Sequence, residues 1–470
     1  MKKQPADKSY FFDKGYKDIA RVMKTTWANA FKPVNNELHR LGKLFATNVF
    51  GAVFMAICDV VVFIPITLII ILVNSLFSVV FLISFLILAI IVYVLYTMAF
   101  ICDGLFCLLK GISSSCPNCQ NKFIHPSYKC PKCGRIHSQL RPSKYGIMRR
   151  RCLCGTKLPT TFFNGRQKLQ AICAKCNTLI KDGGKHIEIT IPVIGGKSSG
   201  KTCFISMAIA GIEESAKQNG LEFQYSSSVQ GDYYEINIAK LKRGVLPDKT
   251  FDERMMYYQF YLTPQKSKIK TLISFCDVAG ETFEDNSKIS EQIGYKYANA
   301  FILLLDPLSI PLYRREIQSQ INLNEYGASS KSMDEVLSSL INTLENMYCI
   351  STKTIIKTDV AVVFTKSDLP GLNEKIGDKA VKSFLNGSKV SKYEAQNQLC
   401  EKFLIDYSES NFLNNLKSKF KSIQFFTCSA LGHVVDGKGF AAVGVDEPAL
   451  WIIDKASKAI NLKEKWGKKI

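Results

Sequence analysis

The chain has 470 residues, with 61 Lys and Arg against 40 Asp and Glu, and its formal net charge is +21. It also contains 16 cysteines. A basic chain with cytoplasm-like features argues against disulfides, so the composition favours cysteines that bind metal or lie in apolar surroundings. Composition and motifs predict four segments. They are a basic N-terminal segment (1–48), an apolar segment (49–109), a cysteine-rich segment (110–185) and a nucleotide-binding segment (186–470).

The apolar segment predicts a transmembrane helical hairpin. Residues 49–73 and 76–101 each supply about 25 apolar residues, enough to cross a hydrocarbon core of about 30 Å. Asn74 and Ser75 are the polar break between these runs and are expected to form the turn. The apolar run begins too late and is too long for a signal peptide. The alternative is a buried pair of helices in a soluble protein.

Charge predicts the orientation of this hairpin. Residues 1–48 carry more Lys and Arg than Asp and Glu, and no Asp or Glu occurs between Gly104 and Lys181. Positive flanks favour the cytoplasmic side, so we expect a multi-pass membrane protein with both flanks in the cytoplasm. The basic flank predicts contact with anionic lipid. Nucleic acid is possible but not favoured, because few aromatic residues are available for base stacking.

Paired cysteines in the next segment predict two structural zinc sites. Tetrahedral Zn²⁺ needs four thiolates brought together by two tight turns. The expected first set is Cys116, Cys119, Cys130 and Cys133, and the expected second set is Cys152, Cys154, Cys173 and Cys176. The second set contains a CxC half in place of CxxC, which is a variation on the pattern. His137 is an alternative ligand, although a solvated loop histidine is the simpler interpretation.

A phosphate-binding loop opens the last segment. Residues 195–202 follow an apolar strand, precede a helical pattern and have the form GxxxxGK[ST]. Backbone N–H groups of such a loop approach phosphates closely, Lys201 can reach the β- and γ-phosphates, and the Thr202 hydroxyl can ligate Mg²⁺. The predicted phosphate-binding residues are Gly195, Gly196, Lys197, Ser198, Ser199, Gly200, Lys201 and Thr202.

Later motifs favour GTP over ATP. A buried strand ends in Asp277 and Gly280 of a DxxG motif, in which the aspartate supports Mg²⁺ and the glycine senses the γ-phosphate. Thr365, Lys366 and Asp368 have the form [NT]KxD, whose aspartate can accept hydrogen bonds from N1–H and the 2-amino group of guanine. A further strand leads to Ser429, Ala430 and Leu431, which can contact guanine O6. An ATP-specific protein is the alternative.

Two further residues are candidates for the hydrolytic step. The motifs described so far resemble those of translation-factor-like (TRAFAC) GTPases, whose second Mg²⁺ ligand is usually a threonine between the first helix and the DxxG motif. Thr250 lies in that interval. Glu281 follows Gly280, at the position where many of these GTPases carry a glutamine that orients water. A glutamate there could orient water but could also repel the γ-phosphate. We therefore expect slow or partner-dependent hydrolysis, and a non-hydrolysing GTP-binding scaffold remains the alternative.

Strand and helix patterns alternate through residues 186–470. Residues 257–262 and 271–278 resemble a hairpin, residues 300–306 and 359–364 resemble buried parallel strands, and residues 333–348 have helical spacing. The polar stretch 376–420 is also expected to be helical. This alternation predicts an α/β doubly wound sheet with its ligands at the carboxyl ends of the strands.

The motifs together resemble GTPases of the translation-factor-like (TRAFAC) class. With the cysteine pairs, the linker 140–159, the segment 164–169 and the helix 447–453, residues 112–460 are similar to the type-2 double-GTPase family of prokaryotic conflict systems. The resemblance implies a partner GTPase-like protein and a role in a defence-related system. The expected protein is a membrane-anchored GTPase that uses GTP, Mg²⁺ and Zn²⁺. A membrane-bound nucleic-acid sensor is the second alternative.

Overall fold

A computed structural model gives the fold of residues 4–47, 49–116, 121–180, 186–226, 228–247, 256–264, 270–277, 295, 297–329, 331–387, 389–433 and 439–456. The chain divides into two structural units. Unit 1 comprises Met1–Leu109 and His125–Lys181, and unit 2 comprises Lys110–Ile124 and Asp182–Ile470. Unit 2 therefore contains the phosphate-binding motif, whereas unit 1 contains the apolar segment and most of the predicted zinc ligands.

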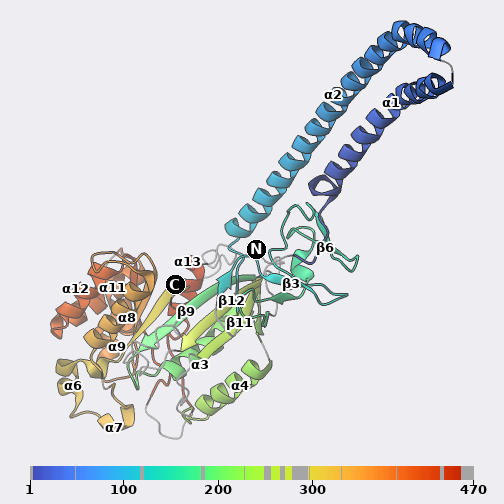
Figure 1. Cartoon of the computed structure of the whole chain (residues 1–470). Helices are drawn as coiled ribbons and strands as arrows, with labels where there is room; N and C mark the ends of the chain where they lie inside the picture. The colour runs from blue at the N-terminus through green and yellow to red at the C-terminus, as the bar shows by residue number, and fades with distance from the viewer. Residues whose placement is uncertain are drawn as a thin grey trace. The chain divides into compact units, whose positions relative to one another are not determined.

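A mixed seven-stranded sheet forms the centre of unit 2 (Figure 1), with the strand order β10-β11-β12-β9-β13-β14-β15. Strands β12, β9, β13, β14 and β15 are parallel, and β11 is antiparallel to both β10 and β12. The strands are β9 (His186–Gly195), β10 (Leu221–Tyr225), β11 (Met256–Pro264), β12 (Lys270–Asp277), β13 (Ala300–Leu305), β14 (Asp359–Phe364) and β15 (Ile423–Thr427). The predicted α/β class and the predicted β11–β12 hairpin are confirmed.

Each central strand is apolar because both of its faces are covered. In β13, Ala300, Ile302 and Leu304 belong to one buried cluster. The alternate residues Phe301, Leu303 and Leu305 belong to another. Successive side chains of a strand point to opposite faces, so a strand buried on both sides reads as a continuous apolar run. This is why the strand carries no polar alternation.

Helices pack on both faces of this sheet. One cluster includes side chains from α3 (Lys201–Gln218), α4 (Ser228–Lys242) and α13 (Glu447–Ala456). The other includes side chains from α6 (Pro311–Ile317), α8 (Met333–Tyr348), α9 (Leu372–Lys375), α11 (Lys392–Asp406) and α12 (Ser410–Lys419). The shorter elements are η5 (Pro307–Ser309), α7 (Leu323–Tyr326) and α10 (Asp378–Asn386). The helix predicted at 333–348 and the helical stretch at 376–420 are confirmed.

Helix α8 shows how the sequence sets such a boundary. The Ser332 hydroxyl accepts a hydrogen bond from the Glu335 backbone N–H at 3.3 Å. This contact satisfies an N–H group that has no partner within the first turn, and it follows the serine-to-glutamate spacing of a capping box. The helix therefore begins at Met333.

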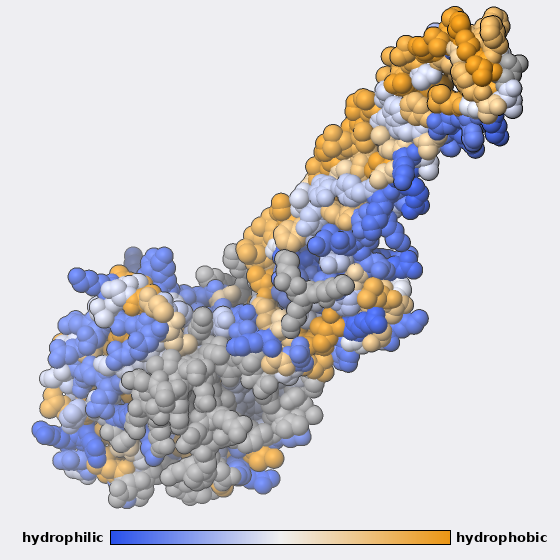
Figure 2. All heavy atoms as spheres, in the orientation of Figure 1, coloured by the Kyte–Doolittle hydropathy of each residue, from blue (hydrophilic) through white to orange (hydrophobic). Residues whose placement is uncertain are grey.

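Unit 1 contains two long helices that lie side by side and run in opposite directions (Figure 1). A short 3-10 turn, η1 (Tyr10–Phe12), precedes α1 (Lys14–Thr47), and α2 spans Val49–Leu109. Phe11 and Tyr16 both pack on Phe85, and Trp27 Nε1 donates to Ser78 Oγ at 3.2 Å. Figure 2 shows apolar surface along α2 and hydrophilic surface along α1.

The predicted turn at Asn74 and Ser75 is wrong, because both residues lie within α2. The Asn74 side chain donates to the Ile70 carbonyl at 2.8 Å, so its polar group is satisfied inside the helix and does not interrupt it. By length and composition, α2 is able to cross a membrane. Its 61 residues correspond to about 90 Å, roughly three times the hydrocarbon thickness. The structure thus contains one continuous apolar helix in place of the predicted hairpin within 49–101.

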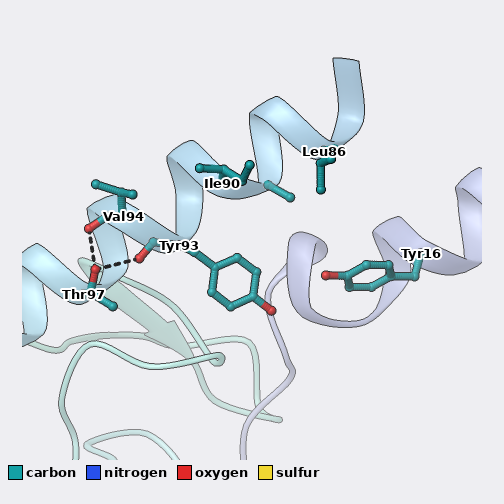
Figure 3. Close-up of a pocket in the computed structure, with 7 residues that line it drawn as sticks. Tyr16, Leu86, Ile90, Tyr93, Val94 and Thr97 are labelled. Atoms are coloured by element: carbon teal, nitrogen blue, oxygen red, sulfur yellow. Dashed lines mark hydrogen bonds between the residues drawn. The ribbon is translucent and has the colours of Figure 1, made fainter. Parts of the chain in front are cut away.

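A shallow apolar hollow lies where the first turns of α1 meet α2 (Figure 3). It is lined by Tyr16 of α1 and by Leu86, Ala89, Ile90, Tyr93, Val94 and Thr97 of α2. The hydroxyl groups of Tyr16 and Tyr93 point toward each other, and Thr97 donates to the carbonyls of Tyr93 and Val94. The Thr97 hydroxyl is thus satisfied within α2.

The rest of unit 1 is built from very short strands. One sheet has the order β4-β3-β7-β8, and β5 and β6 form a separate hairpin. The strands are β3 (Ser127–Lys129), β4 (Ile136–His137), β5 (Arg149–Arg151), β6 (Lys157–Pro159), β7 (Ala171–Ile172) and β8 (Leu179–Ile180), with η2 at Arg166–Lys168. A further short hairpin, β1 (Ser114–Ser115) with β2 (Lys122–Phe123), belongs to unit 2. Such small sheets have little core of their own, which is the usual setting for a structural metal.

Candidate nucleotide and metal sites

The phosphate-binding motif adopts the strand–loop–helix arrangement that its sequence predicts. Strand β9 ends at Gly195 and α3 begins at Lys201. The Lys201 ammonium donates to the Gly195 carbonyl at 2.9 Å and to the Gly196 carbonyl at 3.0 Å. Gly200 has φ +84°, a left-handed conformation that glycine adopts without a Cβ penalty. The first backbone N–H groups of α3 therefore face the loop, which is the arrangement that binds phosphate.

The two leading glycines of the loop have no room for a side chain. A Cβ on Gly195 would lie 3.1 Å from both Cβ and the carbonyl oxygen of Leu304, and a Cβ on Gly196 would collide with Ser329 Oγ. Lys197 and Ser198 are exposed on the loop, whereas Ser199 is buried. The loop thus packs closely against Leu304 of strand β13 and against Ser329.

Thr202 and Asp277 lie together next to this loop. The Thr202 hydroxyl donates to Asp277 Oδ2 at 3.3 Å, and Asp277 stands at the end of β12 with 6% exposure. Burial raises the pKa of the Asp277 carboxyl, against the opposing effects of Lys201 and the Thr202 hydroxyl. Burial also lowers the pKa of Lys201, an effect that Asp277 opposes and that Lys331 reinforces. The hydroxyl and the carboxylate form an oxygen pair suited to a hydrated Mg²⁺.

The residues predicted to read guanine follow β14 and β15. The Thr365 hydroxyl donates to the Leu305 carbonyl at 3.1 Å, and Lys366 takes a left-handed conformation with φ 56°. The Ser429 hydroxyl donates to Asp368 Oδ1 at 2.5 Å. This contact joins residues 365–368, here called the TKSD loop, to residues 429–431, here called the serine loop. The two predicted base-binding loops are therefore brought together.

Ala430 and Leu431 continue the serine loop, and the Ala441 backbone N–H donates to the Leu431 carbonyl at 2.9 Å. The phosphate loop, Asp277, the TKSD loop and the serine loop all follow the carboxyl ends of parallel strands. Ligands of open α/β sheets bind at this edge. Three predicted residues, Thr250, Gly280 and Glu281, lie outside the described residues.

Sequence reasoning missed Asp306, which is buried at the end of β13. Asp306 Oδ2 accepts from Lys366 Nζ at 2.7 Å and from the Ser329 backbone N–H at 2.8 Å, and its Oδ1 accepts from the Leu308 N–H at 3.0 Å. An acidic residue at the carboxyl end of a fully apolar strand could have indicated a site. The sequence analysis includes Asp306 in the strand 300–306, because Asp306 belongs to none of the nucleotide-binding motifs.

A cluster of cysteines in unit 1 combines one pair from each of the two predicted zinc sets. Cys130, Cys133, Cys152 and Cys154 offer four sulfurs that all lie within 4.8 Å of one another. Cys130 Sγ is 3.6 Å from Cys154 Sγ, and Cys133 Sγ is 3.5 Å from Cys152 Sγ. Zn–S bonds of about 2.3 Å at tetrahedral angles separate sulfurs by about 3.8 Å. The set therefore fits zinc.

This grouping differs from the predicted sets because cysteine pairs that are neighbours in sequence are not neighbours in the fold. Cys130 and Cys133 lie in the β3–β4 turn, where the Cys130 N–H donates to the Arg135 carbonyl at 2.9 Å. Cys152 and Cys154 lie in the β5–β6 turn. Cys173 and Cys176 lie in the β7–β8 turn, Cys116 belongs to unit 2, and Cys119 lies outside the described residues. His137, the alternative ligand, is buried and is not part of the cysteine cluster.

The fold and the site define unit 2 as a P-loop nucleotide-binding domain of the GTPase type. The model of the Double-GTPase 2 family matches residues 189–404, and this part of the chain fits that family. The resemblance seen in the sequence is thereby confirmed, and the family supports a GTP-binding GTPase.

Two other comparisons are less informative. The crystal structure of the S. cerevisiae Ski7 GTPase-like domain, bound to GTP, is similar with 10% sequence identity and a TM-score of 0.30. The similarity covers 58% of this chain and 51% of that one, so this chain spans about half the length of the solved relative. No curated protein matches the sequence.

Proposed function

We propose that this protein is a membrane-anchored GTPase that binds GTP with Mg²⁺ and hydrolyses it. The observation that carries the proposal is the contact between Thr202 and Asp277 beside the Lys201 loop. Lys201 would bind the β- and γ-phosphates, while the Thr202 hydroxyl and Asp277 would hold the cation. Bound Mg²⁺ would neutralise charge that develops on the phosphates. Its charge would also favour the ionised form of Asp277, whose pKa burial raises.

The base-binding part of the proposal rests on Asp368 and Ser429. An aspartate that is held in place by the Ser429 hydroxyl keeps one carboxylate oxygen oriented and leaves acceptor capacity for N1–H and the 2-amino group of guanine. Adenine has no such pair of donors at these positions. We therefore propose selectivity for GTP over ATP.

The hydrolytic step is proposed for Glu281 and Thr250. Glu281 would orient the attacking water and Thr250 would complete the Mg²⁺ ligands. Because a carboxylate next to the γ-phosphate also repels it, turnover is expected to be slow without a partner. Because the sequence resembles the type-2 double-GTPase family of conflict systems, a partner GTPase-like protein and a place in such a system are also parts of this proposal.

Zinc is proposed as the structural metal of the short-stranded part of unit 1. Cys130, Cys133, Cys152 and Cys154 would bind one ion, and a closed set of four thiolates leaves no open position for catalysis. The four other predicted ligands, Cys116, Cys119, Cys173 and Cys176, are also two CxxC pairs. A second structural zinc ion is therefore retained in the proposal.

Helix α2 is proposed as the membrane anchor, with the zinc and GTPase segments in the cytoplasm. Leu72 and Leu76 are 71% and 66% exposed on α2, an arrangement that lipid would cover. The exposed Arg149 and Arg151 flank the buried Arg150 and are proposed to contact anionic lipid. Carbonate extraction of native membranes tests the anchor, since Leu72→Arg/Leu76→Arg should release the chain. If the variant stays in the membrane after carbonate extraction, this result would contradict the role of α2 as the anchor.

Nucleotide binding and turnover by the full chain in detergent or nanodiscs test the proposal, with Lys201→Ala as the control. Mg²⁺-dependent GTP hydrolysis that disappears in Lys201→Ala would support it. Tight GTP binding without turnover would favour the non-hydrolysing scaffold. Preference for ATP would remove the guanine assignment. Binding to anionic vesicles and to RNA would be compared between the wild type and Arg149→Gln/Arg151→Gln. Loss of vesicle binding alone would favour lipid contact, and loss of RNA binding alone would favour nucleic-acid sensing.

A further inference from the structure

The segment before helix α8 lies directly against the phosphate loop. A Cβ placed on Gly196 would collide with Ser329 Oγ and would lie 3.8 Å from Lys331 Cβ. The Ser329 hydroxyl donates to the Lys331 carbonyl at 3.3 Å, which ties the two residues together locally. Lys331 is half-buried, and its positive charge is among the influences that lower the pKa of Lys201. The first carbon of the Lys331 side chain therefore lies beside the phosphate loop.

One buried carboxylate connects this segment with the base-binding loop. Asp306 Oδ2 accepts from both the Ser329 backbone N–H and Lys366 Nζ. The Lys366 ammonium also donates to the Gly327 carbonyl at 3.0 Å. The side chains of Asp306 and Lys366 are 1% and 15% exposed, so water competes little with their ion pair. Lys366, which the motif assigns to base reading, is thus bonded to the segment that covers the phosphate loop.

We propose that Lys331 is an additional phosphate-binding residue, and that Asp306 is a positioning residue that couples Lys331 to the base-binding Lys366. This inference rests on the proposed binding of GTP. Neither residue belongs to the GxxxxGK[ST], DxxG or [NT]KxD motifs. A lysine side chain that starts beside the phosphate loop is long enough to reach the outer phosphates of a bound triphosphate and to donate charge-assisted hydrogen bonds to them. Asp306 contributes by holding Ser329 against Gly196, so that the Lys331 backbone stays beside the loop.

The affinity of the full-length protein for GTP, GDP and GMP tests the role of Lys331. Lys331→Gln should weaken GTP binding by about tenfold, the usual scale for one charge-assisted hydrogen bond. It should weaken GDP binding less and leave GMP binding unchanged, because the contact is with the outer phosphates. Lys331→Arg should retain most of the affinity. Lys402→Gln is the matched control, since it removes the same charge from the exposed face of α11 in the same unit.

Coupling through Asp306 is tested by a double-mutant cycle. If Asp306 positions Lys331, the loss caused by Lys331→Gln should largely disappear in an Asp306→Asn background. Additive losses would overturn the positioning role, and melting curves of each variant exclude simple unfolding. An unchanged GTP affinity of Lys331→Gln would overturn the phosphate contact while GTP binding itself stands. A wild-type chain that binds no GTP, with Lys201→Ala indistinguishable from it, would overturn the proposed function and this inference together.

Discussion

Arg166 donates from Nη1 to Asp103 Oδ2 at 2.7 Å, and the two side chains are 3% and 1% exposed. Asp103 lies near the carboxyl end of α2, and Arg166 lies in η2 between the β5–β6 hairpin and β7. Asp103 Oδ1 also accepts from the Phe162 N–H at 2.8 Å, and Arg166 Nη1 donates to the Thr160 carbonyl at 2.7 Å. The end of the apolar helix is thereby joined to the cysteine-bearing part of unit 1.

Loss of one partner of this pair should destabilise unit 1 strongly. Asp103→Ala leaves Arg166 buried without its counter-ion, which costs about 3–5 kcal/mol of unfolding free energy. Hydrogen exchange of the full chain would show the loss as faster exchange in residues 125–180. Glu213→Gln is the control, because it breaks the exposed pair with Lys217 and should change stability by under about 1 kcal/mol. Equal exchange in both variants would contradict the role of the pair.

Zinc content distinguishes the observed cysteine pairing from the one that the sequence predicted. If Cys130 and Cys152 bind the same ion, Cys130→Ser/Cys152→Ser should lose one zinc ion per chain. If they belong to different sites, the same double variant should lose both. Elemental analysis measures the number of zinc ions bound per purified chain. Cys400→Ser is the matched control, because Cys400 is buried in unit 2 and is not part of any cysteine cluster among the described residues.

Base selectivity should change when Asp368 becomes an amide. Asp368→Asn loses an acceptor for the 2-amino group of guanine, and the new amide N–H₂ can donate to the 2-carbonyl of xanthine. We expect GTP affinity to fall by at least about tenfold and XTP affinity to rise by a similar factor. Competition binding with the two nucleotides measures this exchange. Loss of affinity for both nucleotides would indicate that Asp368 supports the loop and does not read the base.

Acid should destabilise unit 1 through His125. Burial, together with the charges of Arg141 and Arg166, lowers the pKa of His125 to about 4 from 6.5. The unfolded chain therefore binds more protons between these values, so stability is full above about pH 6.5 and falls as the pH drops toward 4. Melting curves at pH 7 and pH 5 should show a smaller difference for His125→Gln than for the wild type. Zinc content is measured alongside, because acid also releases thiolate-bound zinc. Equal pH sensitivity of the two proteins would contradict this assignment.

The nucleotide-binding edge of unit 2 follows from sequence to a large extent. The phosphate loop, the parallel strands and helix 333–348 are local signals, because glycine spacing, apolar runs and a capping serine act within a few residues. The positions of Lys201, Thr202 and Asp277 at one edge follow from the same pattern, since parallel strands bring their carboxyl ends together. The strand order itself, with β9 between β12 and β13, is not a local property.

Long-range contacts decided the remaining features. Only the tertiary structure brings Cys130 and Cys133 to Cys152 and Cys154, because the β3–β4 and β5–β6 turns that carry them belong to separate sheets. Asp306 became a candidate only when Lys366 and Ser329, which lie in other loops, were found on the same carboxylate oxygen. Asn74 predicted a turn by its polarity, but its bond to Ile70 allows the helix to continue. Sequence determined which groups this protein has for binding phosphate and metal, and tertiary structure decided which of them meet.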